Sequence, residues 1–174
     1  MGWKIAYLLL AIGAIVYLIG FFSCFISLLG FKRKLAKRIA ALSIVFSEKR
    51  EVLLALDTYY REAKMECSEA DLECVRKVAA MQEKRIKDTD VPFYYETLSS
   101  LEKRLRYLAD SNSWIKAGDD FETMLSLLSD LNGNYRRIAA VYNSDLLGYE
   151  YWRKQIFYRL WFFLFGFRKK ERIH

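Results

Sequence analysis

Side chains of the kinds that catalyse reactions or bind metals are sparse in this sequence. The only histidine is His174, and the three cysteines form no CxxC pair. A structural zinc site needs about four closely spaced ligands, so none is expected. The neighbouring carboxylates Asp119 and Asp120 could serve acid–base chemistry, but acidic residues also favour the start of a helix. We therefore expect no catalytic residue, no metal site, no cofactor and no enzymatic activity.

The cysteines do not suggest a disulfide framework. Cys24 lies inside an apolar segment, and Cys67 and Cys74 are seven residues apart, on a similar face of any helix that contains both. That geometry is poor for a mutual disulfide. We interpret all three as free thiols in a reducing compartment.

An uncharged, apolar segment at residues 5–31 dominates the chain. Its 27 residues contain no Asp, Glu, Lys, Arg or His, and a run of 18 or more such residues is typical of a transmembrane helix. A helix of this length would measure about 40 Å, against a hydrocarbon core of about 30 Å. The sequence therefore predicts one transmembrane helix within residues 1–31.

Two observations favour an anchor that is not cleaved. The apolar run is about twice as long as the 7–15 residues usual in a signal peptide, and no small-residue cleavage site follows it. Processing as a lipoprotein would use Cys24, but Phe21 and Phe22 just before it fit that reaction poorly. The segment is therefore predicted to be a signal-anchor.

The charges beside the apolar segment predict its orientation. Five basic residues follow it closely: Lys32, Arg33, Lys34, Lys37 and Arg38. Only Lys4 and the terminal amine precede it. Because positive residues are retained on the cytoplasmic side, we expect the N-terminus outside an inner (cell) membrane and the rest of the chain in the cytoplasm.

The net charge of +7 is concentrated at two places along the chain. Residues 32–50 hold seven basic residues against one acidic residue, and residues 168–174 hold four against one. Residues 51–155 hold 15 basic and 19 acidic residues, a net charge of −4. A nucleic-acid binder normally carries its basic patch on the folded domain. We therefore expect contacts with lipid headgroups and no nucleic-acid partner.

The chain beyond residue 31 has the pattern of amphipathic helices. A stripe of apolar residues at spacings of three and four runs through residues 32–66 and is interrupted at Lys49. Three further helices are predicted at residues 69–89, 92–110 and 119–155, the first of them capped by Ser68 with Asp71. Short loops make consecutive helices antiparallel. The prediction is thus an all-α chain, with an antiparallel up-and-down, coiled-coil-like bundle of about four long helices in residues 32–155.

The C-terminal segment, residues 156–174, is apolar and ends in basic residues. Residues 156–167 carry a single charge, Arg159, and are too few to span a bilayer. Two interpretations remain open, burial against the rest of the protein and contact with the membrane surface. For the second we expect these residues at the surface, in addition to the five that follow the anchor: Trp161, Phe162, Phe165, Arg168, Lys169 and Lys170.

The last part of the chain carries a spaced set of aromatic and polar residues: Phe121, Tyr142, Asn143, Tyr149, Gly166 and Phe167, with Arg168 and Lys169 after them. In these residues and their spacing the chain resembles the LemA family of bacterial membrane proteins. The resemblance implies a membrane-anchored antiparallel helical bundle, in which these residues are structural, and it implies no enzymatic activity. The chain departs from the family pattern at Asn132-Gly133, where the family usually has Glu-Asn, and at Ala139, where it has arginine.

Three functions are compatible with these observations. The first is a scaffold or adaptor that presents a cytoplasmic bundle to membrane or cytoplasmic proteins, as a monomer or as a homo-oligomer. The second is a bundle that binds a lipid or a small apolar ligand, for which an elongated internal cavity would be needed. The third is an enzyme, for which the sequence offers no motif. The first is our prediction from the sequence.

Overall fold

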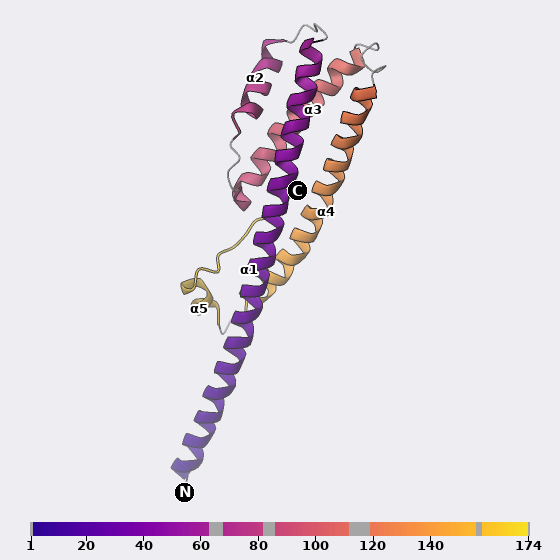
Figure 1. The fold of residues 1–174 in the computed structure, drawn as a ribbon. Coiled ribbons are helices and arrows are strands. Elements are labelled where there is room, and N and C mark those ends of the chain that lie inside the picture. Colours follow the sequence, from indigo (N-terminus) through magenta and orange to yellow (C-terminus); the bar gives the residue numbers. More distant parts are fainter. Residues whose placement is uncertain (1, 63–67, 82–85, 112–118, 156–157, 174) are drawn as a thin grey trace. The chain divides into compact units, whose positions relative to one another are not determined.

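The computed structural model describes residues 2–62, 68–81, 86–111, 119–155 and 158–173. In these ranges the chain is helical and contains no strand, which confirms the all-α prediction for the described part. The elements are five α-helices and one short 3-10 helix (Figure 1): α1 (Gly2–Glu62), α2 (Glu69–Ala79), η1 (Asp88–Asp90), α3 (Val91–Ser111), α4 (Asp119–Arg153) and α5 (Arg159–Leu164).

The contacts divide the chain into two compact units. Unit 1 consists of Met1–Ala36 and Asn143–Arg172, and unit 2 consists of Lys37–Tyr142 and Ile173–His174. Helices α1 and α4 contribute residues to both units. Each unit has its own set of buried side chains.

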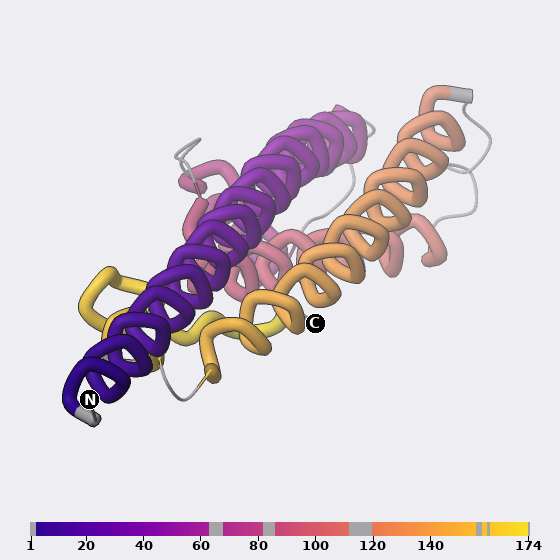
Figure 2. Tube along the Cα trace, turned by 90° about the horizontal axis from the view of Figure 1, so that it is seen from below, coloured from indigo at the N-terminus to yellow at the C-terminus, as the bar shows by residue number. Residues whose placement is uncertain are grey.

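Helix α1 is one unbroken helix of 61 residues, as Figures 1 and 2 both show. The only proline of the chain is Pro92, so nothing in residues 2–62 removes a backbone donor from the helix. Among the described helices, α1 is the one long and apolar enough to cross a membrane. The structure describes α1 as far as Glu62, and residues 63–67, which include Cys67 and the predicted end of the helix at residue 66, lie outside the described part.

Helix α2 begins as the sequence predicts. The backbone N–H of Asp71 donates to the Ser68 hydroxyl (3.3 Å), and the backbone N–H of Ser68 donates to the Asp71 carboxylate (3.1 Å). This reciprocal pair is a capping box. The pKa of Asp71 is lowered, because hydrogen bonds from Ser68 and the charge of Arg104 (2.7 Å) outweigh the opposing effect of its burial.

The predicted end of this helix at residue 89 is wrong, because α2 ends at Ala79. The Met81 N–H donates to the Val78 carbonyl (3.2 Å), which closes the last turn in the tighter i to i−3 pattern. A new helical turn, η1, then begins at Asp88, where the Lys87 N–H donates to the Asp90 carboxylate (3.2 Å). Ile86 is buried as expected, although outside α2, and Gln82, expected on the same face, lies outside the described residues.

Helices α3 and α4 lie close to their predicted positions. The structure has them at Val91–Ser111 and Asp119–Arg153, within two residues of the predicted ends. Pro92 stands in the first turn of α3, where a missing N–H costs no hydrogen bond. The periodicity of their apolar residues was therefore a reliable guide to these two helices.

Aromatic contacts fix how α1 runs beside α3 in unit 2. Phe46 of α1 stacks on Tyr94 of α3 with ring centroids 6.0 Å apart, and the Tyr60 hydroxyl donates to the Leu105 carbonyl at 3.1 Å. From the first contact to the second, the chain advances along α1 from Phe46 to Tyr60 and along α3 from Tyr94 to Leu105. The two helices therefore run in the same direction here. Burial raises the pKa of the Tyr60 phenol to about 12, with a smaller contribution from the neighbouring Tyr59.

Helix α4 runs in the opposite direction to α1 within unit 2. Phe46 contacts Tyr135 with ring centroids 5.7 Å apart, whereas Tyr60 contacts Phe121 at 6.3 Å. From the first contact to the second, the residue number in α1 rises from 46 to 60, whereas the residue number in α4 falls from 135 to 121. The apolar side chains between these contacts make the core of unit 2, and the most deeply buried include Leu42, Leu53, Leu56, Leu98, Leu101 and Leu128.

Replacing a core leucine should destabilise unit 2. Leu56 and Leu128 are 1% and 0% exposed, so Leu56→Ala or Leu128→Ala should each lower the free energy of unfolding by about 2–5 kcal/mol through lost burial and the cavity left behind. The measurement is chemical unfolding of the full chain in detergent, followed by circular dichroism. Leu127→Ala is the matched control, because Leu127 is 45% exposed and should change little. Losses below about 1 kcal/mol at both buried sites would contradict the core assignment.

Candidate functional site

A cluster of polar side chains lies inside the core of unit 2. The Lys49 ammonium is 2.7 Å from the Glu102 carboxylate and 2.7 Å from the side-chain oxygen of Asn132. The Asn132 amide donates to both Glu102 oxygens at 3.0 and 3.2 Å. Arg106 donates to the same carboxylate through Nε (3.0 Å) and Nη2 (2.9 Å). These four residues, which we call the polar cluster, join α1, α3 and α4.

Aromatic rings enclose one side of the polar cluster. The Lys49 ammonium lies over the Tyr95 ring, 6.0 Å from its centroid, and Tyr95 stacks on Tyr135 with centroids 4.5 Å apart. Lys49 is 3% exposed and Glu102 is 8% exposed. Burial raises the pKa of Tyr135 to about 12, with a contribution from Tyr95, so this phenol stays neutral at physiological pH.

The polar cluster is a buried ion pair in which neighbouring side chains occupy the carboxylate. Burial alone would raise the pKa of Glu102, but hydrogen bonds and charges from Lys49 and Arg106 outweigh it and lower the pKa. Glu102 is therefore ionised at neutral pH, and both of its oxygens accept hydrogen bonds from neighbouring side chains. A general base must reach the proton that it removes. This geometry favours a structural role for the cluster.

Unit 1 contains a second distinctive arrangement, in which α5 packs against the apolar part of α1. The Phe162 ring stacks on Phe21 with centroids 6.0 Å apart, and Phe25 contacts Phe165 and Phe167 at 5.4 and 5.6 Å. Figure 2 shows α5 beside the first part of α1. Phe162 and Phe167 are 1% and 3% exposed, so these rings are core residues of unit 1.

The other face of α5 is apolar and exposed. Phe163 is 70% exposed and Leu164 is 66% exposed, whereas Trp161 and Phe165 are about half exposed and their rings also contact Phe21. Phe162 was predicted to lie at the membrane surface; that prediction is wrong, because its ring is covered by α1. Trp161 and Phe165 are accessible, as contact with a membrane would require. Burial against the rest of the protein thus holds for Phe162, and contact of the exposed side chains with a membrane stays a prediction.

Residues near the C-terminus hold α5 to the end of α4. The Tyr149 hydroxyl donates to the Arg168 carbonyl at 2.8 Å. Gly166 has a φ of +75°, a left-handed conformation that side chains with a Cβ rarely adopt. This turn places the buried ring of Phe167 directly before the exposed Arg168. Three residues of the spaced set that resembles the LemA family, Tyr149, Gly166 and Phe167, therefore lie together in unit 1.

The remaining members of that set lie in helix α4. Tyr142 is completely buried in unit 2, and Phe121 is buried against Tyr60. Asn143 is half-buried in unit 1. Phe121 and Tyr142 thus occupy packing positions in unit 2.

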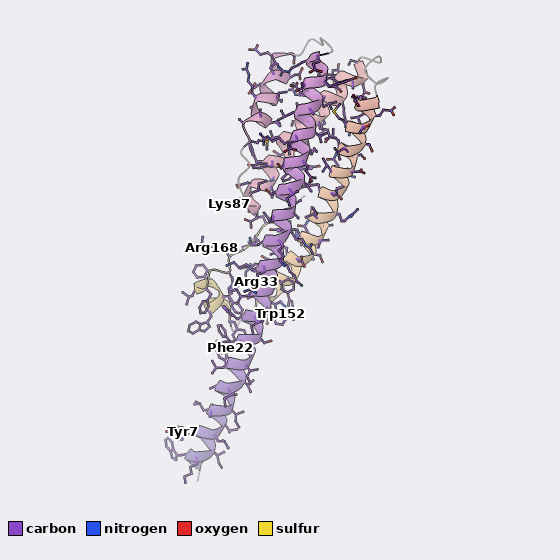
Figure 3. The ribbon with its side chains drawn as sticks, in the orientation of Figure 1. Tyr7, Phe22, Arg33, Lys87, Trp152 and Arg168 are labelled. Atoms are coloured by element: carbon purple, nitrogen blue, oxygen red, sulfur yellow. The ribbon has the colours of Figure 1, made fainter. Side chains whose placement is uncertain are left out.

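The predicted basic residues are accessible. All five that follow the apolar segment are exposed, as are Arg168 and Lys169, while Lys170 is half-buried. The Lys32 ammonium lies 5.4 Å from the centre of the Phe167 ring. This contact brings the start of the basic stretch of α1 close to the turn that precedes Arg168 in unit 1, and Arg33 and Arg168 can be followed in Figure 3.

Sequence reasoning missed the partners of Lys49. The lysine was visible as an interruption in an apolar stripe, but nothing local indicates that Glu102, 53 residues later, comes to meet it. Glu102 does fall on the spacing of Leu98 and Leu105, which are buried. The available signal was a pair of opposite charges, Glu102 and Lys49, each at a position where the apolar stripe of its own helix would otherwise place an apolar residue.

Comparison of the chain with protein-family models, with curated proteins and with solved structures finds no match in any of the three. The fold and these sites define a helical protein with one candidate membrane-spanning helix. The resemblance to the LemA family rests on the residues quoted above.

Removing the charge of Glu102 should destabilise unit 2. Glu102→Gln leaves Lys49 buried without a carboxylate, and the loss of one partner of a buried pair typically costs about 3–5 kcal/mol. Chemical unfolding of the full chain in detergent measures this, with Glu96→Gln at an exposed position of the same helix as control. Because the folded-state pKa of Glu102 is lowered, its contribution is present above the unfolded carboxyl pKa of about 4.3 and is lost as pH falls through the folded value. An equal difference between the two proteins at neutral and strongly acidic pH would contradict the ion pair.

Two neighbouring phenylalanines should differ in how they hold α5. Phe162→Ala should release α5 from α1 and speed hydrogen exchange of the amides of α5, since its ring is buried against Phe21. Phe163→Ala removes a ring that is 70% exposed and should leave this exchange unchanged. The measurement is hydrogen–deuterium exchange of the full chain in detergent. Equal exchange in both variants would show that α5 is not held by the Phe162 contact.

Proposed function

We propose that this protein is a non-enzymatic scaffold or adaptor, anchored in a membrane by α1, that presents unit 2 to partner proteins. The observation that carries the proposal is the exposure of α1. Every side chain described in residues 3–19 is exposed, and nearly all are apolar. Figure 3 shows the side chain of Tyr7 standing out from this part of the helix.

A bilayer is the environment that suits this surface. Residues 3–19 would be about 25 Å long as a helix, close to the roughly 30 Å of a hydrocarbon core. Packing within unit 1 supports an anchor that is kept after synthesis rather than a cleaved signal sequence. Removing the segment would take away Tyr17, Phe21 and Phe25, against which Tyr158, Phe162 and Phe167 pack.

The orientation follows from the exposed basic residues. Lys32, Arg33 and Lys34 are exposed directly after the apolar segment, and Lys37 and Arg38 follow them. By the positive-inside rule they belong in the cytoplasm, with the N-terminus outside. Unit 2 is then the cytoplasmic part, and its helices form the antiparallel up-and-down bundle proposed from the sequence and supported by the opposite directions of α1 and α4 there.

The surface of unit 2 supports a role in binding proteins. Ile44, Phe93 and Tyr107 are exposed at 61%, 62% and 73%, and exposed aromatic residues are enriched at protein interfaces. No group of three or more potential metal ligands occurs in the part of the chain that the structure describes. The resemblance to the LemA family adds a membrane-anchored bundle of the same general kind.

Site-specific photo-crosslinking tests the proposal. A crosslinking side chain at Phe93 or Tyr107 in the full chain, in intact cells, should capture the same discrete protein, and Phe93→Ser should abolish capture from Tyr107. Glu96 is the matched exposed position at which a crosslinker should capture less. Cys74, which is half-buried in α2, should react with a membrane-impermeant thiol reagent only after the cells are opened. Labelling of Cys74 in intact cells, or no discrete product from either aromatic position, would contradict the proposal.

A further inference from the structure

Unit 1 contains a small hollow lined by basic and aromatic side chains. Its volume is about 230 Å³, and it lies between the end of α4, helix α5 and the residues after α5. The side chains that line it are four cations and two aromatic rings: Arg153, Arg159, Arg168, Lys169, Phe163 and Phe167. We call it the basic hollow.

The positive charge of the basic hollow is largely uncompensated. Residues 150–172 hold seven basic and two acidic residues, a net charge of +5. Glu150 accepts from Arg153 (3.3 Å) and lies 3.5 Å from the Lys154 ammonium. Among the described residues, no carboxylate pairs with Arg159, Arg168 or Lys169, all of which are exposed. The hollow therefore presents three available cations to an anion.

Arg153 is more rigidly placed than the other three. Its side chain is 20% exposed and is held by Glu150. Its Nε is buried and has no hydrogen-bond partner among the described residues. A guanidinium that one carboxylate already holds in place loses little side-chain entropy when it binds an oxyanion.

The basic hollow lies where unit 1 changes from apolar to basic. Phe167 lines the hollow, and the Lys32 ammonium lies 5.4 Å from the centre of its ring. Lys32 is the first charged residue after the apolar segment of α1. On the other side the hollow is bounded by Phe163, which is 70% exposed and is followed by the exposed Leu164. Cations and exposed apolar side chains thus meet at one place.

We propose that the basic hollow binds the headgroup of an anionic phospholipid. The phosphate lies among Arg153, Arg159, Arg168 and Lys169, and the acyl chains run along Phe163 and Leu164. Arginine suits this role because its planar guanidinium binds two phosphate oxygens at once. A volume of about 230 Å³ is below the roughly 300–1,000 Å³ of pockets that enclose a whole drug-sized ligand, and so suits a headgroup. The inference rests on the proposed membrane anchor.

Calorimetric titration of the full chain in non-ionic detergent tests the inference. The probes are dihexanoyl phosphatidylglycerol, dihexanoyl phosphatidylcholine and inorganic phosphate. We expect the anionic lipid to bind more tightly than the other two. Arg159→Gln combined with Arg168→Gln should weaken its binding roughly thirty-fold, since two cation contacts of about fivefold each are lost.

The matched control is Arg33→Gln combined with Arg172→Gln, which removes the same charge from exposed residues of unit 1 that do not line the hollow. It should weaken binding less than about threefold, and circular dichroism should show both double variants equally helical. An equal loss in both would show diffuse attraction in place of a site, and equal binding of phosphatidylcholine would refute a preference for anionic lipid. Binding of inorganic phosphate as tight as that of the anionic lipid would mean a free-phosphate site.

Extraction of membranes with alkaline carbonate separates this inference from the proposed function. The Arg159→Gln, Arg168→Gln variant should remain in the membrane pellet like the unchanged chain, because α1 anchors both. Release of the unchanged chain would refute the membrane anchor itself, whereas retention without a lipid preference in the titration would refute only the basic hollow.

Discussion

The exposed apolar surface of α1 is the constraint on which the rest of this structure depends. Leaving a large apolar side chain in water instead of burying it costs about 1.5–3 kcal/mol. A handful of such residues therefore matches the roughly 5–15 kcal/mol of stability available to a whole domain. Within unit 1, α5 and the residues around it cover one face of α1 from about Gly20 onward. Residues 3–19 stay exposed in the described structure, and an apolar environment such as the proposed membrane would remove this cost.

In unit 2, α1 packs against the other helices through one face only. There α1 has a one-sided stripe that includes Leu42 and Leu53, with Lys49 buried between them. A buried ion pair seldom adds much net stability, because desolvation offsets its attraction. The ion pair does, however, distinguish one axial alignment of α1 against α3 from an alignment shifted by a turn. A shift of α1 by one turn would bring Phe46 or Leu53 opposite Glu102 and leave that carboxylate beside an apolar side chain. The polar cluster thus favours a single register of three helices whose leucines alone would tolerate several.

The predictable parts of this fold were those determined by local sequence. The absence of breakers predicts α1, the periodicity of apolar residues predicts α3 and α4, and Ser68 predicts the start of α2. The early end of α2 was missed because it depends on a turn at residues 80–81 that composition does not show. The pairing of Lys49 with Glu102 joins distant segments. The faces of α5 were not predictable either, because a segment that is apolar on all sides carries no periodicity to tell Phe162 from Phe163.

One departure from the LemA-like pattern, at Asn132-Gly133, falls on the polar cluster of unit 2. Where the family usually has Glu-Asn, this chain has Asn132-Gly133, so α4 offers no carboxylate there. The Asn132 amide instead donates to Glu102 of α3 while its oxygen accepts from Lys49. The negative charge that a buried lysine requires is thus supplied by another helix, and Asn132 connects the two charged groups. The ion pair therefore holds α1 to α3, while α4 is joined to both through a neutral amide.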